Sequence, residues 1–178
     1  MKLGRSSVIL VAAVCSAPFL AAWILYLSGW RPAATSNYGE LIPPRPVLQA
    51  AAATLAPLRG KWVLVAFDGA SCDAYCEKKL YFMRQVRRAQ GKDMERIERL
   101  WVISGAAKPR PELLAAIEGT RIVEQRDFPS RGEFPGNSAE HIYLIDPLGN
   151  LMLRYPRDPD PAGMVKDLQR LLKYSRFG

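Results

Sequence analysis

Two adjoining segments decide the fold of this 178-residue chain: Trp62-Val63-Leu64-Val65-Ala66-Phe67 and, shortly after it, Ser71-Cys72-Asp73-Ala74-Tyr75-Cys76. The first is β-branched and aromatic, follows a glycine, and predicts a buried strand. The second places two cysteines four residues apart, and positions i and i+4 of a helix lie on the same face. A strand that passes through a short loop into a helix therefore brings both sulfur atoms to one exposed edge. There the pair can close a disulfide or bind one soft metal ion.

The remaining periodicities predict how the rest of the domain is ordered. Helices are expected at 76–89, 111–117 and 161–174, and strands at 100–104, 121–124, 142–145 and 151–155. The last two strands flank Asp146-Pro147-Leu148-Gly149-Asn150, which is a turn signal, so they form a hairpin. Parallel strands with helical crossovers come first and an antiparallel hairpin closes the sheet. We therefore predict an α/β domain with a thioredoxin-like fold, with both cysteines at the carboxyl end of the first strand.

The N-terminal segment predicts a membrane anchor. Residues 8–30 carry no charged side chain, and about 20 apolar residues are enough to cross a bilayer. Trp23, Tyr26 and Trp30 lie toward the far end, as aromatic residues do at membrane interfaces. Lys2 and Arg5 favour a cytoplasmic N-terminus at 1–7. A cleaved signal peptide is the alternative, but this run is longer than a signal core and lacks a clean small-residue cleavage site.

Composition separates a tether from the domain. Residues 31–59 are rich in proline and alanine and predict a stiff spacer, followed by the thioredoxin-like domain at 60–178. Three cysteines are too few for a disulfide scaffold, and Cys15, inside the apolar run, is expected to be an apolar filler.

The formal charge is +8, and much of the excess lies between residues 78 and 99. We interpret this stretch as a solvated helix face, with an acidic partner or anionic lipid headgroups as the alternative. It contains Lys78, Lys79, Arg84, Arg87, Arg88, Lys92, Arg96 and Arg99. Nucleic acid is excluded as a partner, because no binding motif or row of stacking aromatics accompanies the charge.

The two cysteines are expected to differ in reactivity. The N-terminus of a helix carries a partial positive charge, which lowers the pKa of a nearby thiol. Cys72 lies in the predicted loop and Cys76 in the first turn, so Cys72 should be the more exposed and reactive. Asp73 is placed to cap the helix, and Tyr75 to shield the pair. Asp68 is a turn residue that could tune the thiol pKa, although a structural role is the more common one.

His141, the single histidine of the chain, precedes the predicted strand 142–145. In a thioredoxin-like fold this position lies near the cysteine loop, where many thiol oxidoreductases carry a cis-proline that this chain lacks. Cys72, Cys76 and His141 together would form a three-coordinate set suited to copper. Zinc is also possible, although three ligands would leave one of its coordination positions open. The alternative is a partly exposed histidine at a strand start with no ligand role.

These residues resemble the Sco (SenC) family of membrane-anchored, thioredoxin-like copper proteins of cytochrome c oxidase assembly. The resemblance is carried by the N-terminal span, by Gly60–Phe67 leading to Cys72-x-x-x-Cys76, and by His141 ahead of Ile142–Gly149. It implies copper ligation by Cys72, Cys76 and His141, with an oxidase subunit or another membrane-associated protein as client. Together with the charge bias, it implies a single-pass protein of the bacterial inner membrane whose domain faces the periplasm. Glu77 in place of a proline, and the glutamate before His141 in place of an aspartate, mark a divergent member.

Three functions remain open from the sequence. The first is a copper-binding assembly factor that uses no cofactor besides that metal. The second is an enzyme, a thiol–disulfide oxidoreductase with a narrow client, in which Cys72 attacks and Cys76 resolves the mixed disulfide. The third is a membrane-bound interaction module without chemistry, which predicts that both cysteines can be replaced without loss of function.

Overall fold

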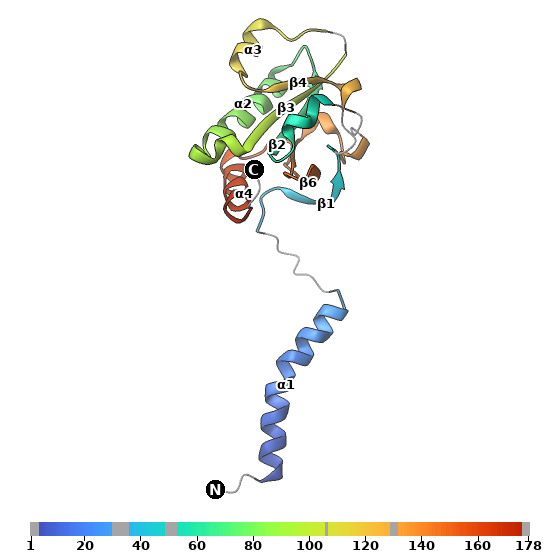
Figure 1. The fold of residues 1–178 in the computed structure, drawn as a ribbon, viewed down its shortest axis with the longest axis vertical. Coiled ribbons are helices and arrows are strands. Elements are labelled where there is room, and N and C mark those ends of the chain that lie inside the picture. The colour runs from blue at the N-terminus through green and yellow to red at the C-terminus, as the bar shows by residue number, and fades with distance from the viewer. Residues whose placement is uncertain (1–3, 30–35, 49–52, 106, 129–131, 176–178) are drawn as a thin grey trace. The chain divides into compact units, whose positions relative to one another are not determined.

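The computed structural model describes residues 4–29, 36–48, 53–105, 107–128 and 132–175 (Figure 1). The chain divides into two compact units, Met1–Ser36 and Asn37–Gly178, which are considered separately below.

The first unit contains one helix, α1 (Arg5–Leu27), whose described side chains are exposed. Its segment Ser6–Leu27 contains an 18-residue window with a mean hydropathy of 2.4, and its 22 residues at 1.5 Å per residue span about 33 Å. This helix is therefore long and apolar enough to cross a bilayer, as the sequence predicts. It ends at Leu27 rather than at Trp30, which lies outside the described residues.

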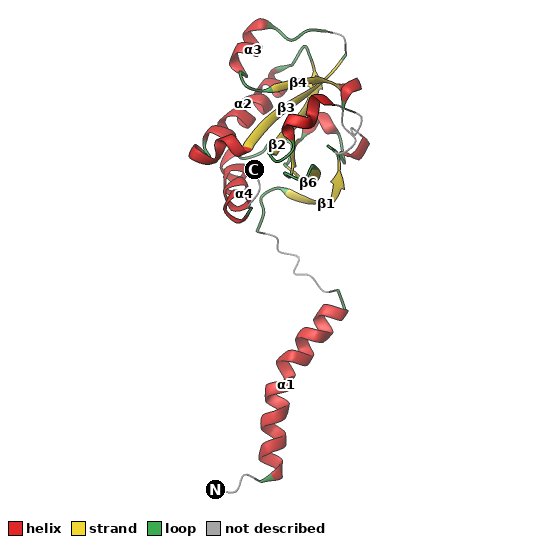
Figure 2. Ribbon diagram, viewed as in Figure 1, coloured by secondary structure: helices red, strands yellow, loops and turns green. Residues whose placement is uncertain are grey.

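The second unit is built around one mixed sheet with helices packed beside it (Figure 2). The sheet has six strands in the order β1-β6-β5-β2-β3-β4. Strands β2, β3 and β4 are parallel, whereas β5, β6 and β1 continue the sheet in antiparallel pairs. The elements are β1 (Glu40–Pro46), β2 (Trp62–Gly69), α2 (Ala74–Arg88), β3 (Ile97–Ser104), α3 (Pro111–Ala116), β4 (Arg121–Glu124), β5 (Ile142–Ile145), β6 (Asn150–Arg154) and α4 (Pro161–Tyr174). The predicted thioredoxin-like arrangement is confirmed.

Strand β2 lies at the centre because both of its faces are apolar. Val65 pairs with Leu100 of β3 on one side and with Tyr143 of β5 on the other. Side chains alternate between the two faces of a strand, so Leu64 and Ala66 enter one core cluster while Val65 enters the other. The uninterrupted apolar run that decides the fold is thus a strand buried on both sides.

Different elements cover the two faces of the sheet. One core cluster contains Leu80 and Met83 of α2, Leu113 of α3 and Leu168 of α4, so all three helices cover that face. The other cluster contains Leu55 and Leu58 of a 3-10 helix (Ala53–Leu58), together with Phe128 and Phe134 from loops. Since both clusters lie wholly within Asn37–Gly178, this unit has a complete core of its own.

The predicted tether at 31–59 is too long. From Asn37 onward the chain belongs to the domain, and β1 pairs with β6 through Leu41 opposite Leu153 and Arg45 opposite Leu151. The prolines of β1 favoured a spacer over a strand in the prediction, because proline cannot donate a ladder hydrogen bond and is rare inside sheets. Strand β1 lies at the sheet edge, and its register with β6 shifts between Leu41 and Arg45, where Pro43 and Pro44 stand; edge strands and bulges are the places where sheets accept proline.

The solvated basic face predicted between residues 78 and 99 also needs correction. Lys78, Arg88 and Lys92 are exposed, but Lys79 and Arg99 are buried, at 1% and 3% exposure. Arg99 lies on β3, donates to the carbonyl oxygen of Glu118, and has its pKa lowered to about 10, mainly by burial. The basic stretch therefore contains both surface charges and interior ones.

Candidate functional site

Cys72 and Cys76 form a disulfide between the end of β2 and the first turn of α2, with their Cα atoms 5.2 Å apart. Strand β2 ends at Gly69, and a turn closed by the Cys72 N–H on the Gly69 carbonyl leads into the pair. Cys72 has a φ of +43°, and it is the one non-glycine residue in the described part of the chain with a positive φ. Such a conformation is unfavourable for a residue with a Cβ and is concentrated at functional sites.

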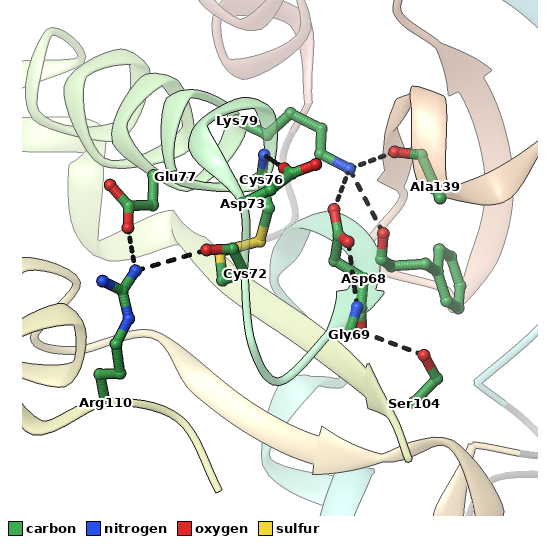
Figure 3. Close-up of a disulfide and its surroundings, with 11 residues drawn as sticks. Asp68, Gly69, Cys72, Asp73, Cys76, Glu77, Lys79, Ser104, Arg110 and Ala139 are labelled. Atoms are coloured by element: carbon green, nitrogen blue, oxygen red, sulfur yellow. Dashed lines mark hydrogen bonds and ion pairs between the residues drawn. A yellow bond between two sulfur atoms is a disulfide. The ribbon is translucent and has the colours of Figure 1, made fainter. Parts of the chain in front are cut away.

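The start of α2 is fixed by Asp73, as predicted. Its carboxylate accepts a hydrogen bond of 2.8 Å from the Cys76 N–H, which is the N-cap arrangement. Cys76 therefore lies within the first helical turn, where the partial positive charge of the helix stabilises a thiolate. The carbonyl oxygen of Cys72 accepts from Arg110, whose guanidinium also pairs with Glu77 (Figure 3).

The two cysteines differ only slightly in exposure. Cys72 is 3% exposed and Cys76 is completely buried, so Cys72 is the more exposed residue, as predicted, but both are buried. Both belong to the core cluster on the helix-covered face of the sheet. Cys72 is thus the cysteine of the pair that keeps any exposed surface.

Lys79 is the residue of this site that the sequence analysis missed. Its ammonium group lies 2.8 Å from the Asp68 carboxylate and donates to the carbonyl oxygens of Phe67 and Ala139. Three acceptors satisfy its three donors, as a buried ammonium requires. Figure 3 shows this group joining the end of β2 to the turn that holds Ala139. The helical period offered a signal, because Cys76, Lys79, Leu80 and Met83 share one face of α2.

Tyr75 lies one turn before Lys79 on α2, with its ring centroid 5.1 Å from the Lys79 ammonium group, and also links the helix to neighbouring backbone. Its hydroxyl lies within hydrogen-bond distance of the carbonyl oxygens of Glu140 and Arg157. The pKa of Tyr75 is raised above its usual value, mainly by burial and secondly by the negative charge of Asp158. The phenol therefore keeps its proton and donates. The residue thus helps to fix the segment that leads to His141, and its shielding of the cysteine pair stays a prediction.

His141 directly precedes β5, but its ring lies apart from the two sulfur atoms. The Nδ1 atom is 2.9 Å from the Tyr155 carbonyl oxygen, which can only accept, so Nδ1 carries a proton. The ring packs against Tyr143, at 6.0 Å between ring centroids, and lines a cavity of about 290 Å³ beside Arg154 and Arg157. Tyr143 belongs to the core cluster on the sheet face opposite the disulfide.

The described conformation does not fit a copper ion. The two sulfur atoms are bonded to each other, and His141 lies two residues before Tyr143 along extended backbone, on the same face as that ring. Among the described residues, no group of three His, Cys, Asp or Glu side chains comes together in a way that could hold a metal ion. The ligand set of Cys72, Cys76 and His141 therefore stays a prediction.

Comparison with solved structures supports the fold. Apo Sco1 from Thermus thermophilus is 18% identical, with a TM-score of 0.57, and the match covers 79% of this chain and 99% of that one. Yeast Sco1 with copper bound is 17% identical, with a TM-score of 0.51 and coverage of 67% and 80%. A SCO1/SenC family lipoprotein from Bacillus anthracis is 15% identical, with a TM-score of 0.50 and coverage of 79% and 97%. The resemblance to Sco proteins is thus confirmed at the level of the fold.

Comparison of sequences identifies the family. No curated protein matches the chain in sequence. A family model described as "transmembrane-like, thioredoxin-like, C-terminal domain" matches residues 62–175, which is more than half of the chain and runs from the start of β2 to just past α4. The chain therefore belongs to this family of transmembrane-like, thioredoxin-like C-terminal domains.

Proposed function

We propose that this protein exchanges disulfides with the cysteines of a client protein at the membrane, through Cys72 and Cys76. The observation that carries the proposal is the disulfide itself, which joins the loop after β2 to the first turn of α2. In this position the disulfide can break and leave a thiolate that the helix stabilises. A purely structural disulfide would need neither the helix N-terminus nor a positive φ at one of its cysteines.

The direction of attack is inferred from the exposure of the two cysteines. A client thiolate attacks Sγ of Cys72, the cysteine that keeps some exposed surface, and forms a mixed disulfide. The bond between the two cysteines breaks, and its electron pair leaves on Cys76 as a thiolate in the first turn of α2. A second client thiolate then attacks the mixed disulfide and releases Cys72. The client is oxidised to a disulfide and the pair is reduced; the same steps in reverse reduce a client.

The location of the client follows from the anchor. A stable disulfide is typical of oxidising compartments, and Lys2 and Arg5 before the apolar helix favour a cytoplasmic N-terminus. Both considerations support a periplasmic domain of a bacterial inner-membrane protein. The resemblance to Sco proteins makes a cytochrome c oxidase subunit the leading candidate for the client.

Copper binding or delivery is the second proposal, and it applies only to the reduced protein. The observation that favours it is the shared fold with yeast Sco1, which is described with copper bound. Binding would require the disulfide to be reduced and His141 to leave the Tyr155 carbonyl and reach the helix-covered face. The contacts of Tyr75 and Lys79 with residues 139 and 140 oppose that movement.

Trapping of the client tests the redox proposal. In a Cys15→Ser background, Cys76→Ser should accumulate a mixed disulfide with the client through Cys72, and the adduct should dissolve on addition of dithiothreitol. The matched Cys72→Ser protein should trap nothing, because its remaining thiol is buried. Equal trapping by both variants, or a pair that strong reductants leave oxidised in the folded protein, would refute the proposal.

Anaerobic copper titration of the reduced protein tests the second proposal. Stoichiometric uptake that is lost in His141→Ala and in Cys72→Ser would support copper binding. The absence of uptake by the reduced protein, or uptake that His141→Ala leaves unchanged, would remove this ligand set and leave the exchange proposal unaffected.

A further inference from the structure

A cleft of about 390 Å³ lies at the end of the domain opposite the disulfide. Trp62, the first residue of β2, lines it, whereas the disulfide follows Gly69, the last; eight residues of strand separate the two sites by about 25 Å. The volume falls in the range of ordinary ligand sites. The redox site and this cleft are therefore separate features of the domain.

Apolar side chains form the cleft, and several of them stand at its open edge. Leu41 of β1, Leu148 of the β5–β6 turn and Tyr174 of α4 line it and are 47%, 63% and 77% exposed. Met152 and Leu171 contribute partly buried surface. Large apolar residues that are exposed singly need no explanation, but a group of them around one cleft marks an interaction site.

Positive charge adjoins the apolar surface. A second, shallower depression of about 200 Å³ is lined by Lys166, Gln169, Arg170 and Lys173 of α4, and Arg170 lines both depressions. The two acidic residues of the cleft are engaged within the fold. Asp167 accepts from the N–H groups of Tyr38 and Gly39, and Asp146 accepts from Asn150. The charge that this surface presents to a partner is therefore positive.

We propose that this cleft and its basic rim bind anionic phospholipid at a bilayer surface. Apolar side chains that enter the interface, next to lysines that meet anionic headgroups, are the features that hold proteins on membranes. The chain itself keeps lipid within reach of the cleft. Asn37 lines the cleft, and the nine residues 28–36 that separate it from the end of α1 extend at most about 30 Å. The proposal depends on α1 crossing the membrane, and is independent of the disulfide exchange.

Vesicle sedimentation tests the proposal with residues 37–178, the unit that contains the whole sheet and both core clusters. Cooperative unfolding in urea is checked first for each protein. We expect binding to vesicles of equal parts phosphatidylglycerol and phosphatidylcholine, and little binding to phosphatidylcholine alone. Lys166→Gln and Lys173→Gln should each weaken binding about fivefold. Leu148→Ser should weaken it about tenfold.

The matched controls are Lys108→Gln and Arg121→Gln, which remove exposed charges that do not line either depression. They should change vesicle binding by less than about twofold, as their charges lie away from the proposed surface. Equal binding to both kinds of vesicle, no binding at all, or the same effect from the controls as from the cleft variants would overturn the proposal. A dimer in sedimentation velocity that Leu148→Ser abolishes would instead assign the cleft to a second copy of the chain.

Discussion

Replacing Lys79 by methionine removes the ammonium group that joins β2, α2 and the turn before His141, while it keeps most of the aliphatic chain. The change leaves the Asp68 carboxylate with one remaining hydrogen bond, from the Gly69 N–H at 3.0 Å. It also leaves the carbonyl oxygens of Phe67 and Ala139 without their shared donor. A carboxylate without its counter-charge then lies where an ion pair lay before, and both carbonyl oxygens have lost a charged donor.

The size of the loss follows from the burial of the two partners. Removing one member of a buried ion pair costs about 3–5 kcal/mol. The Lys79 side chain is 2% exposed, but that of Asp68 is 21% exposed, so water can solvate part of the carboxylate once it is unpaired. We therefore expect the free energy of unfolding to fall by about 3 kcal/mol in Lys79→Met, at the lower end of that range.

A double-mutant cycle isolates the ion pair from the other effects of the substitution. Asp68→Asn alone leaves a buried ammonium with its carbonyl partners and should destabilise by about 2 kcal/mol. In the double variant neither charge remains, so its loss should be about 2 kcal/mol smaller than the sum of the two single losses. That difference is the coupling between Lys79 and Asp68.

Urea unfolding of residues 37–178 under oxidising conditions, followed by tryptophan fluorescence, measures all three proteins. Lys78→Met is the matched control: the neighbouring lysine also pairs with an aspartate at 3.0 Å, but the two side chains are 49% and 66% exposed. An exposed pair of this kind contributes at most about 1 kcal/mol. A loss in Lys79→Met no larger than that in Lys78→Met, or a coupling near zero, would refute the assignment of Lys79 as the buried link of the site.

Three further predictions concern stability. Reducing the disulfide between Cys72 and Cys76 opens a loop of five residues and should lower the free energy of unfolding by about 2 kcal/mol, measured in urea with and without a phosphine reductant; no change would contradict this. Tyr155→Phe removes a buried hydroxyl for which the described residues offer no hydrogen-bond partner, so it should be neutral or stabilising by up to about 1 kcal/mol. Tyr143→Phe loses a hydrogen bond to the Pro135 carbonyl and should destabilise the fold by about 1 kcal/mol. Burial raises the pKa of Tyr143 to about 12, so the protonated phenol favours the folded state. This contribution to stability is complete below pH 10 and is lost between pH 10 and 12. The free energy of unfolding should therefore fall less steeply over this range in Tyr143→Phe.

The centre of the fold could be predicted because its sequence signals are local and mutually consistent. The apolar run of β2 is buried on both faces, and the predicted bounds of β4, β5 and α4 agree with the structure. Asp73 was recognised as a cap because it stands directly before the helical period. Features that depend on a few neighbouring residues, such as a helix cap or a buried strand, can therefore be predicted from one sequence.

The position of the His141 ring could not be inferred from its place in the chain alone. The topology is right, since His141 precedes β5, and β5 pairs with β2. The side of the sheet is decided by the alternation along the strand, which puts His141 with Tyr143 and away from the helix-covered face that holds the cysteines. Although β5 and β2 are neighbouring strands, the imidazole and the two sulfur atoms therefore lie toward opposite faces of the sheet.

The spacer between the anchor and the domain is shorter than predicted, and its length limits how far from the membrane the domain can act. A spacer over residues 31–59, fully extended, would reach about 95 Å and would let the domain find clients far from the bilayer. The structure assigns Glu40–Pro46 to the sheet edge and buries Val47 and Leu48, so only residues 28–36 remain between α1 and the domain, with a reach of about 30 Å. That distance is close to the diameter of a small domain. The disulfide lies about 25 Å beyond Asn37, at the other end of the domain, so a client must present its cysteines within about 55 Å of the membrane, which favours proteins that are themselves membrane-bound over freely diffusing ones.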